Sequence, residues 1–255
     1  MLYDGVMVIR RIFGVACAVV ALWAAVRWVG AGPDVWTAWE PDGCSTFNCY
    51  CEPIRSQLVR QTIATESNLG FATMALSIAA GLLGARRRAH WVAIGALLAT
   101  ATGSAFYHAS LTRVGDWADL MGTYGLAVLF GFFSASRRWP DRAPLLGLIA
   151  VGVLAVCGVQ MAVAREFQQI VFGLLILAAI ALEVGAPAAP NGRIWLWIGL
   201  ACFAAGAGVW VGDATGRLPC WPDAPLTWHG LWHLLAAIAA GLLCRYHLVQ
   251  NENDA

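Results

Sequence analysis

The chain is dominated by apolar segments of about twenty residues, the length that an α-helix needs to cross the hydrocarbon core of a bilayer. Eight such segments can be read from the sequence, near residues 8–30, 67–85, 91–111, 117–135, 144–164, 168–186, 194–212 and 228–247. Because a bilayer offers no water to unpaired backbone groups, segments of this kind cross it as helices. The sequence therefore predicts an all-α, polytopic membrane helix bundle.

Composition supports this class. Hydrophobic residues make up 60% of the chain, charged residues make up 12%, and the mean hydropathy is +0.66. Many tryptophans lie near the ends of the apolar segments, as in the aromatic belt of a membrane protein. The net charge of +1 gives no indication of a nucleic-acid partner.

The arginines predict the orientation, because cytoplasmic loops carry an excess of basic residues. If the N-terminus is cytoplasmic, ten of the 16 basic residues lie on its side of the membrane and six on the other. Both termini are then expected in the cytoplasm of a bacterium, with the protein in the inner membrane. Arg10 and Arg11 before the first apolar run resemble a signal peptide, but that run is long and contains Arg27. An uncleaved signal anchor is the favoured interpretation, and cleavage is the alternative.

Three histidines lie where polar side chains are costly, since a charge at the centre of a membrane helix costs roughly 2.5 to 3.5 kcal/mol. His108 ends one apolar segment, and His229 and His233 open another. His90 and His247 lie beside arginines at segment edges and are interpreted as interfacial residues.

The predicted topology places six polar residues at one depth, near the outer ends of three segments: Ser104, His108, Asp116, Asp119, His229 and His233. Residues four apart share a helix face, so His229 and His233 could bind one metal. A third histidine from a neighbouring helix would complete a three-histidine zinc site with a fourth position for water, as in catalytic zinc sites.

Each of these residues also has a structural interpretation. His108 could hydrogen-bond across the bundle, and Ser104 could bond to a carbonyl of its own helix. Asp116 is predicted as an N-cap. Asp119 could be a first-turn acid that the helix dipole favours.

Four cysteines are predicted outside the membrane: Cys44, Cys49, Cys51 and Cys220. Disulfides in an oxidising compartment are the expected use. A metal site at Cys49 and Cys51 is the alternative, although no second pair stands at zinc-site spacing.

These motifs resemble the alkaline ceramidases. GSAFYHASLTRVGDWADLM (103–121) resembles their Ser-x3-His and Asp motif, WHGLWH (228–233) resembles their closing His-x3-His, and CEPIRSQLVRQTIATESNLGF (51–71) is similar to their first motif region. The resemblance implies a seven-helix core, zinc bound by His108, His229 and His233, and roles in the reaction for Ser104 and Asp119. It also implies a disulfide between Cys51 and Cys220.

The wider superfamily includes adiponectin-receptor-like proteins and hydrolases that remodel glycolipid anchors. The resemblance divides the chain into an N-terminal signal-anchor helix with an outer loop (1–50), a hydrolase domain (51–248) and a C-terminal tail (249–255). Within the first motif, Ala64 replaces the usual Asn and Gln61 stands where a further acid is expected. Glu52 fits the Cys-Glu element that contributes to a calcium site in animal members, but the rest of that acidic cluster is thin here, so calcium binding by this chain is doubtful.

The expected function is a zinc-dependent hydrolase that cleaves the fatty acyl amide of a ceramide-like membrane lipid with zinc-activated water. The enzyme alternative is an acyl ester hydrolase of phospholipase type. The alternative from another class is a receptor-like seven-helix protein with structural zinc. The expected partner is a membrane lipid substrate, such as an N-acyl sphingoid base.

Overall fold

The structure is a computed structural model of the chain and describes residues 2–44, 50–83, 88–186 and 192–253. Its α-helices are α1 (Leu2–Gly30), α3 (Thr62–Ser67), α4 (Leu69–Ala79), α5 (Arg88–Ser110), α6 (Arg113–Arg138), α7 (Ala143–Val163), α8 (Gln168–Val184), α9 (Arg193–Ala214) and α10 (Trp228–Asn253). Short 3-10 turns are η1 (Trp36–Ala38), η2 (Pro140–Arg142) and η3 (Arg165–Phe167). Cys49 lies outside the described residues. The predicted tail at 249–253 continues α10.

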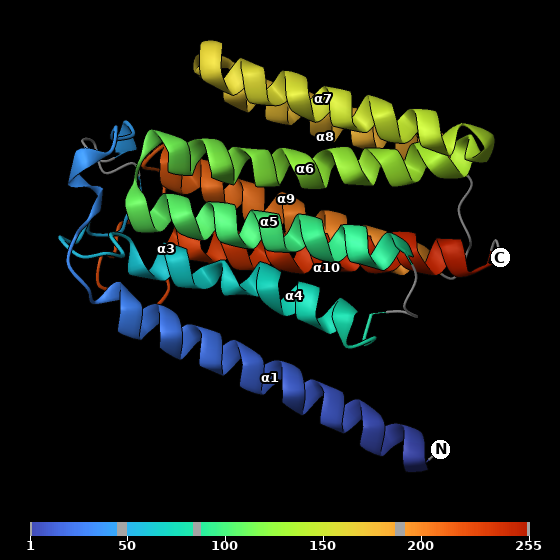
Figure 1. Cartoon of the computed structure of the whole chain (residues 1–255), viewed down its shortest axis with the longest axis horizontal. Coiled ribbons are helices and arrows are strands. Elements are labelled where there is room, and N and C mark those ends of the chain that lie inside the picture. The colour runs from blue at the N-terminus through green and yellow to red at the C-terminus, as the bar shows by residue number, and fades with distance from the viewer. Residues whose placement is uncertain (1, 45–49, 84–87, 187–191, 254–255) are drawn as a thin grey trace.

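The described part of the chain is all-α, as predicted. Seven of its helices are long and apolar enough to cross a membrane, namely α1 and α5 through α10. The chain is therefore a multi-pass membrane protein. The two termini lie at one end of the bundle, and α3 and the Cys51 region lie at the other (Figure 1).

The predicted segment 67–85 is shorter than expected. α4 ends at Ala79, and Gly81 adopts a positive φ of 72°. The amide of Gly81 donates to the Ile78 carbonyl and that of Leu82 to the Ser77 carbonyl. This is a Schellman ending, which closes a helix on a left-handed glycine. α3 and α4 together form the first segment of the core, joined through Asn68.

α1 lies at the edge of the bundle (Figure 1) and packs on α3 and α4. Near its end, the Trp23 indole and the Arg27 guanidinium both donate to the Glu66 carboxylate on α3, each at 3.0 Å. This ion pair fixes the end of α1 against the short helix α3.

The interior forms where α4, α5, α6 and α10 meet, around buried residues such as Phe71, Ile78, Leu97 and Leu126. α5 and α6 approach closely, since a Cβ on Gly122 would lie 2.7 Å from the Thr100 Cα. Small residues at such crossings allow membrane helices to pack backbone against backbone.

A polar network joins α6, α8 and α10 at the end of the bundle that carries the termini. Arg137 pairs with Glu183 at 2.6 Å, and Glu183 also accepts from Ser134 at 2.6 Å. His247 Nδ1 accepts from Arg137, also at 2.6 Å. His90 and His247 are each only 2% exposed, so both lie within the protein.

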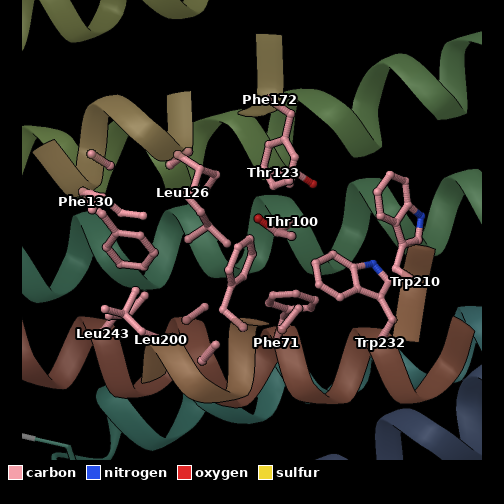
Figure 2. A pocket seen from close by; sticks show the side chains of 18 of the residues that line it. Phe71, Thr100, Thr123, Leu126, Phe130, Phe172, Leu200, Trp210, Trp232 and Leu243 are labelled. Atoms are coloured by element: carbon pink, nitrogen blue, oxygen red, sulfur yellow. The ribbon is translucent and has the colours of Figure 1, made fainter. Parts of the chain in front are cut away.

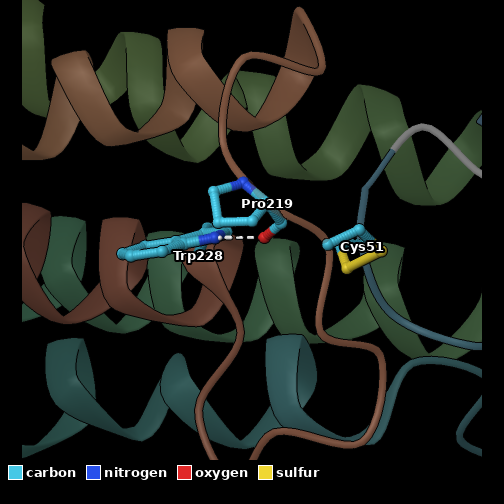
Figure 3. The surroundings of a disulfide bond; sticks show 4 residues. Cys51, Pro219 and Trp228 are labelled. Atoms are coloured by element: carbon cyan, nitrogen blue, oxygen red, sulfur yellow. Dashed lines mark hydrogen bonds between the residues drawn. A yellow bond between two sulfur atoms is a disulfide. The ribbon is translucent and has the colours of Figure 1, made fainter.

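A disulfide joins Cys51 to Cys220, which are 169 residues apart in sequence. Beside it, the Trp228 indole donates to the Pro219 carbonyl at 2.8 Å (Figure 3). The disulfide links the loop that precedes α3 to the loop between α9 and α10. Cys44 is also disulfide-bonded.

Replacing both Cys51 and Cys220 by serine should lower the free energy of unfolding by about 2 to 5 kcal/mol, because the cross-link closes a long loop. Thermal unfolding under non-reducing conditions measures the change. Cys202→Ser is the matched control, since Cys202 is a free cysteine on α9. Equal stabilities of the control and the double variant would contradict the prediction.

Candidate metal centre

The structure brings the three predicted histidines together. His108 comes from the last turn of α5, and His229 and His233 come from the first turns of α10. Each is at most 4% exposed, and one ligand atom from each lies within 4.8 Å of the other two. This group could hold a metal ion.

The nitrogen positions fit one ion. The Nε2 atoms of His108 and His229 lie 3.1 Å apart. Two nitrogens that bind one tetrahedral metal at about 2.1 Å lie roughly 3.4 Å from each other. With the ring protons on Nδ1, both Nε2 lone pairs would face the same point and could bind one cation.

Contacts with Gln61 and with helix α3 orient the rings of His108 and His233. They decide which ring nitrogen of each histidine would face a bound ion. His108 Nδ1 lies 2.7 Å from the Gln61 Oε1 atom. His233 Nδ1 lies 3.1 Å from the Ala64 carbonyl and 2.8 Å from the Ser67 hydroxyl. An oxygen acceptor at Nδ1 holds the proton there and leaves the Nε2 lone pair for a metal.

His229 is held differently. Its ring stacks on Tyr50, with ring centroids 3.6 Å apart and planes 24° apart. Burial and the nearby Asp119 carboxylate raise the pKa of Tyr50, so its hydroxyl keeps its proton. Tyr50 precedes Cys51 in the sequence, so the Cys51–Cys220 disulfide restrains the chain that carries this ring over the site.

We expect Gln61→Leu to weaken metal binding by about 10- to 100-fold, because removing the hydrogen-bond partner of a ligand histidine has effects of this size. Competition with a chelator measures the dissociation constant. Gln57→Leu is the control, since Gln57 is exposed on the preceding loop. Unchanged affinity in Gln61→Leu would show that this amide does not orient His108.

Glu52 does not join the histidines. Its carboxylate accepts from the backbone amides of Ile63 at 2.6 Å and Ala64 at 2.9 Å. Because both oxygens bind the first turn of α3, Glu52 acts as a helix cap. It thereby stabilises the helix that contacts His233.

Ser104 and Asp119 lie beside the histidines. The Ser104 hydroxyl and the Asp119 carboxylate interact across the α5–α6 contact, and both side chains line the same cavity as His229 and His233. The prediction that Asp116 is the N-cap of this helix is wrong: Thr112 is the cap, and its hydroxyl accepts from the Gly115 amide at 3.1 Å.

The pairing of Ser104 with Asp119 depends on Gly103. A Cβ at Gly103 would lie 2.8 Å from the Ala118 carbonyl carbon and 3.2 Å from the Asp119 nitrogen. Any side chain here must push α5 away from α6.

Gly103→Ala is therefore expected to cost about 1 to 3 kcal/mol of stability, as overpacking does. It should also lower any activity that needs the Ser104–Asp119 pair. Gly95→Ala is the matched control on α5, because a Cβ there has no neighbour within 4 Å. Thermal unfolding and turnover of the two variants test this contact, and equal results would contradict it.

The site opens into a cavity of about 410 Å³. Among the lining residues that Figure 2 labels, Trp210 and Trp232 lie at one end of the cavity, Phe71 lies in the middle, and Phe130 and Leu243 lie at the other end. Along α6 the lining extends from Asp116 to Ser134, and along α10 from His229 to His247. The two ends of each stretch are 18 residues apart, which corresponds to about 27 Å of helix.

A scan against family models finds no match for this chain, and a search of the curated proteins finds none either. The interpretation of the site therefore depends on its own geometry.

The sequence interpretation missed the contacts that orient the histidines. Gln61, Ala64 and Ser67 are three residues apart, which places them along one side of a helix. That spacing was the available signal, but Ala64 acts through its backbone carbonyl, which no side-chain pattern reveals. Tyr50 carried no signal of its own.

Proposed function

We propose that the chain is a zinc-dependent intramembrane hydrolase that cleaves the fatty acyl amide bond of ceramide-like lipids. One observation carries the proposal: three buried histidines that could hold a metal ion lie beside the Ser104 and Asp119 side chains, at one end of a mainly apolar cavity. The resemblance of the three motif regions to alkaline ceramidases supports the same reaction.

Three histidines suit catalytic rather than structural zinc. Structural zinc sites are closed by four protein ligands, whereas catalytic sites keep a position for water. Among the described residues, no fourth His, Cys, Asp or Glu completes the group. This favours a hydrolase over a receptor-like protein with structural zinc.

Zinc, when bound, lowers the pKa of a coordinated water to about 7 and so supplies a nucleophile at neutral pH. Asp119 would accept the proton of the attacking water and return it to the leaving amine as general base and acid. The Ser104 hydroxyl would turn from Asp119 to the oxygen of the scissile carbonyl and stabilise its developing charge.

The cavity suits a long acyl chain. An acyl chain in one leaflet spans about 15 Å, half of the roughly 30 Å hydrocarbon core, and the lining of the cavity is longer than this. With the scissile bond beside Ser104, the chain would extend between α6 and α10 toward Phe130 and Leu243. The lipid would enter from the membrane, and a soluble peptide would not suit this lining.

We place the protein in the inner membrane of a bacterium, with the site toward the periplasm and both termini in the cytoplasm. The arginine distribution supports this orientation. The Cys51–Cys220 disulfide at the histidine end agrees with it, because disulfides persist in the oxidising periplasm.

The test is fatty acid release by purified protein from N-acyl sphingoid bases and from glycerophospholipids, with metal content measured on the same sample. Release from the amides with about one zinc per chain, lost in His229→Ala, supports the proposal. Release from the esters alone would indicate the phospholipase-type alternative. Bound zinc without turnover on either class would count against the hydrolase.

A further inference from the structure

A second carboxylate lies beside the Ser104–Asp119 pair and has no part in the reaction described above. Asp116 precedes Asp119 by three residues on α6, so the two side chains are neighbours on one face of that helix. Both line the cavity, and the Asp116 side chain is 9% exposed. A buried carboxylate requires a partner, since an unpaired buried charge is costly.

The cationic partner of Asp116 is shared. Arg165 Nη2 lies 2.8 Å from Asp116 Oδ2 and also pairs with Asp42 Oδ1. Tyr107 donates to the other Asp42 oxygen at 2.7 Å. Burial opposes the ionisation of Asp42, but the Tyr107 hydrogen bond and the Arg165 charge hold the pKa of Asp42 below its usual value.

Asp42 therefore takes up much of the positive charge and hydrogen-bond donation of Arg165. The Asp116 carboxylate can still accept a hydrogen bond from another group. The Arg165 contact to Asp116 Oδ2 lacks the alignment of a hydrogen bond, and that oxygen has no other hydrogen-bond partner among the described residues. A first-turn acid can be stabilised by the helix dipole alone. That effect does not explain why this one is buried in the wall of the cavity.

Local charge restricts the class of ligand. Arg165 is the cation that pairs with both Asp42 and Asp116, and the Asp119 carboxylate lies nearby, so these three acids outnumber the charge of Arg165. Among the described lining residues the cavity has one arginine, Arg193, at the start of α9 and thus at the opposite end. A phosphate group near Asp116 would meet like charge, whereas a hydroxyl or an ammonium group would find an acceptor.

We propose that Asp116 recognises the headgroup of the lipid substrate by accepting a hydrogen bond from a hydroxyl or ammonium group close to the scissile bond. This proposal rests on the proposed function, because it takes the lipid to lie with its acyl carbon beside Ser104. It makes Asp116 a specificity residue that discriminates against phosphodiester headgroups.

The experiment compares Asp116→Asn with the unchanged chain on three N-acyl sphingoid substrates: one with its terminal hydroxyl, one in which hydrogen replaces that hydroxyl, and one in which an amine replaces it. A hydrogen bond to a charged acceptor contributes roughly a 10- to 100-fold preference. We expect kcat/KM to fall by that factor on the hydroxyl substrate and to stay nearly unchanged on the deoxy substrate. A larger fall on the amine substrate would identify ammonium as the preferred group.

Asp42→Asn is the control, because it disturbs the same Arg165 contact from outside the cavity lining. It should affect the three substrates equally. If Asp116→Asn also lowers kcat/KM equally on all three, Asp116 has only a structural role and the proposal fails.

Binding separates this proposal from the hydrolase proposal. The affinities of the hydroxyl and deoxy lipids are measured in His229→Ala and in His229→Ala/Asp116→Asn by the fluorescence of tryptophans such as Trp210 and Trp232, which line the cavity. Tighter binding of the hydroxyl lipid that requires Asp116 supports the headgroup site even if no lipid is hydrolysed. Equal affinities of the two lipids in both proteins would overturn it even if amides are cleaved.

Discussion

Replacing His233 by alanine is expected to reduce the bound metal from about one ion per chain to less than about a tenth of that. The three rings form a triangle: the ring centroid of His233 lies 4.5 Å from that of His229 and 4.9 Å from that of His108, which are 4.7 Å apart. The Nδ1 of His233 is engaged by the Ala64 carbonyl, so its Nε2 is the atom that would bind an ion. Without it, two nitrogens remain, which are too few for a three-ligand site. Metal analysis of the purified variant measures the loss.

His247→Ala is the matched control for this result. His247 is on the same helix, 14 residues and about 21 Å further along, where it bonds to Arg137. The His247→Ala protein should keep its metal, even if loss of the Arg137 contact lowers its stability. Full metal content in His233→Ala would overturn the three-histidine site, and equal loss in both variants would indicate general unfolding.

Hydropathy was sufficient to predict the helices because the bilayer imposes a length and a composition on every spanning segment. It could not locate the end of α4, because Gly81 ends the helix through its backbone conformation and not through its polarity. Likewise, Thr112 and Asp116 are both good cap residues, and only the observed hydrogen bond to Gly115 separates them.

The predicted depth of the six polar residues anticipated the centre itself. His108, His229, His233, Ser104 and Asp119 lie together because the topology brings the ends of α5, α6 and α10 to one side. The orientation of the histidines could not be predicted in this way. It depends on α3, a helix of six residues that is too short to show an apolar period.

Asp119→Asn is expected to lower the turnover number by about 10²- to 10⁴-fold while leaving the metal content unchanged. An amide has nearly the same size as the carboxylate and can still accept a hydrogen bond from Ser104, so packing is preserved. It cannot take a proton from the attacking water or return one to the leaving group. Turnover on an N-acyl sphingoid base, with metal content measured on the same sample, tests this role.

Asp223→Asn is the control for the loss of one negative charge at this end of the bundle, since Asp223 is exposed in the loop before α10. It should retain full turnover. A lower turnover number with intact metal in Asp119→Asn alone would assign the proton transfer to Asp119. Full turnover in that variant would show that another group moves the proton, while the metal centre itself would stand, because Asp119 is not one of its three nitrogen ligands.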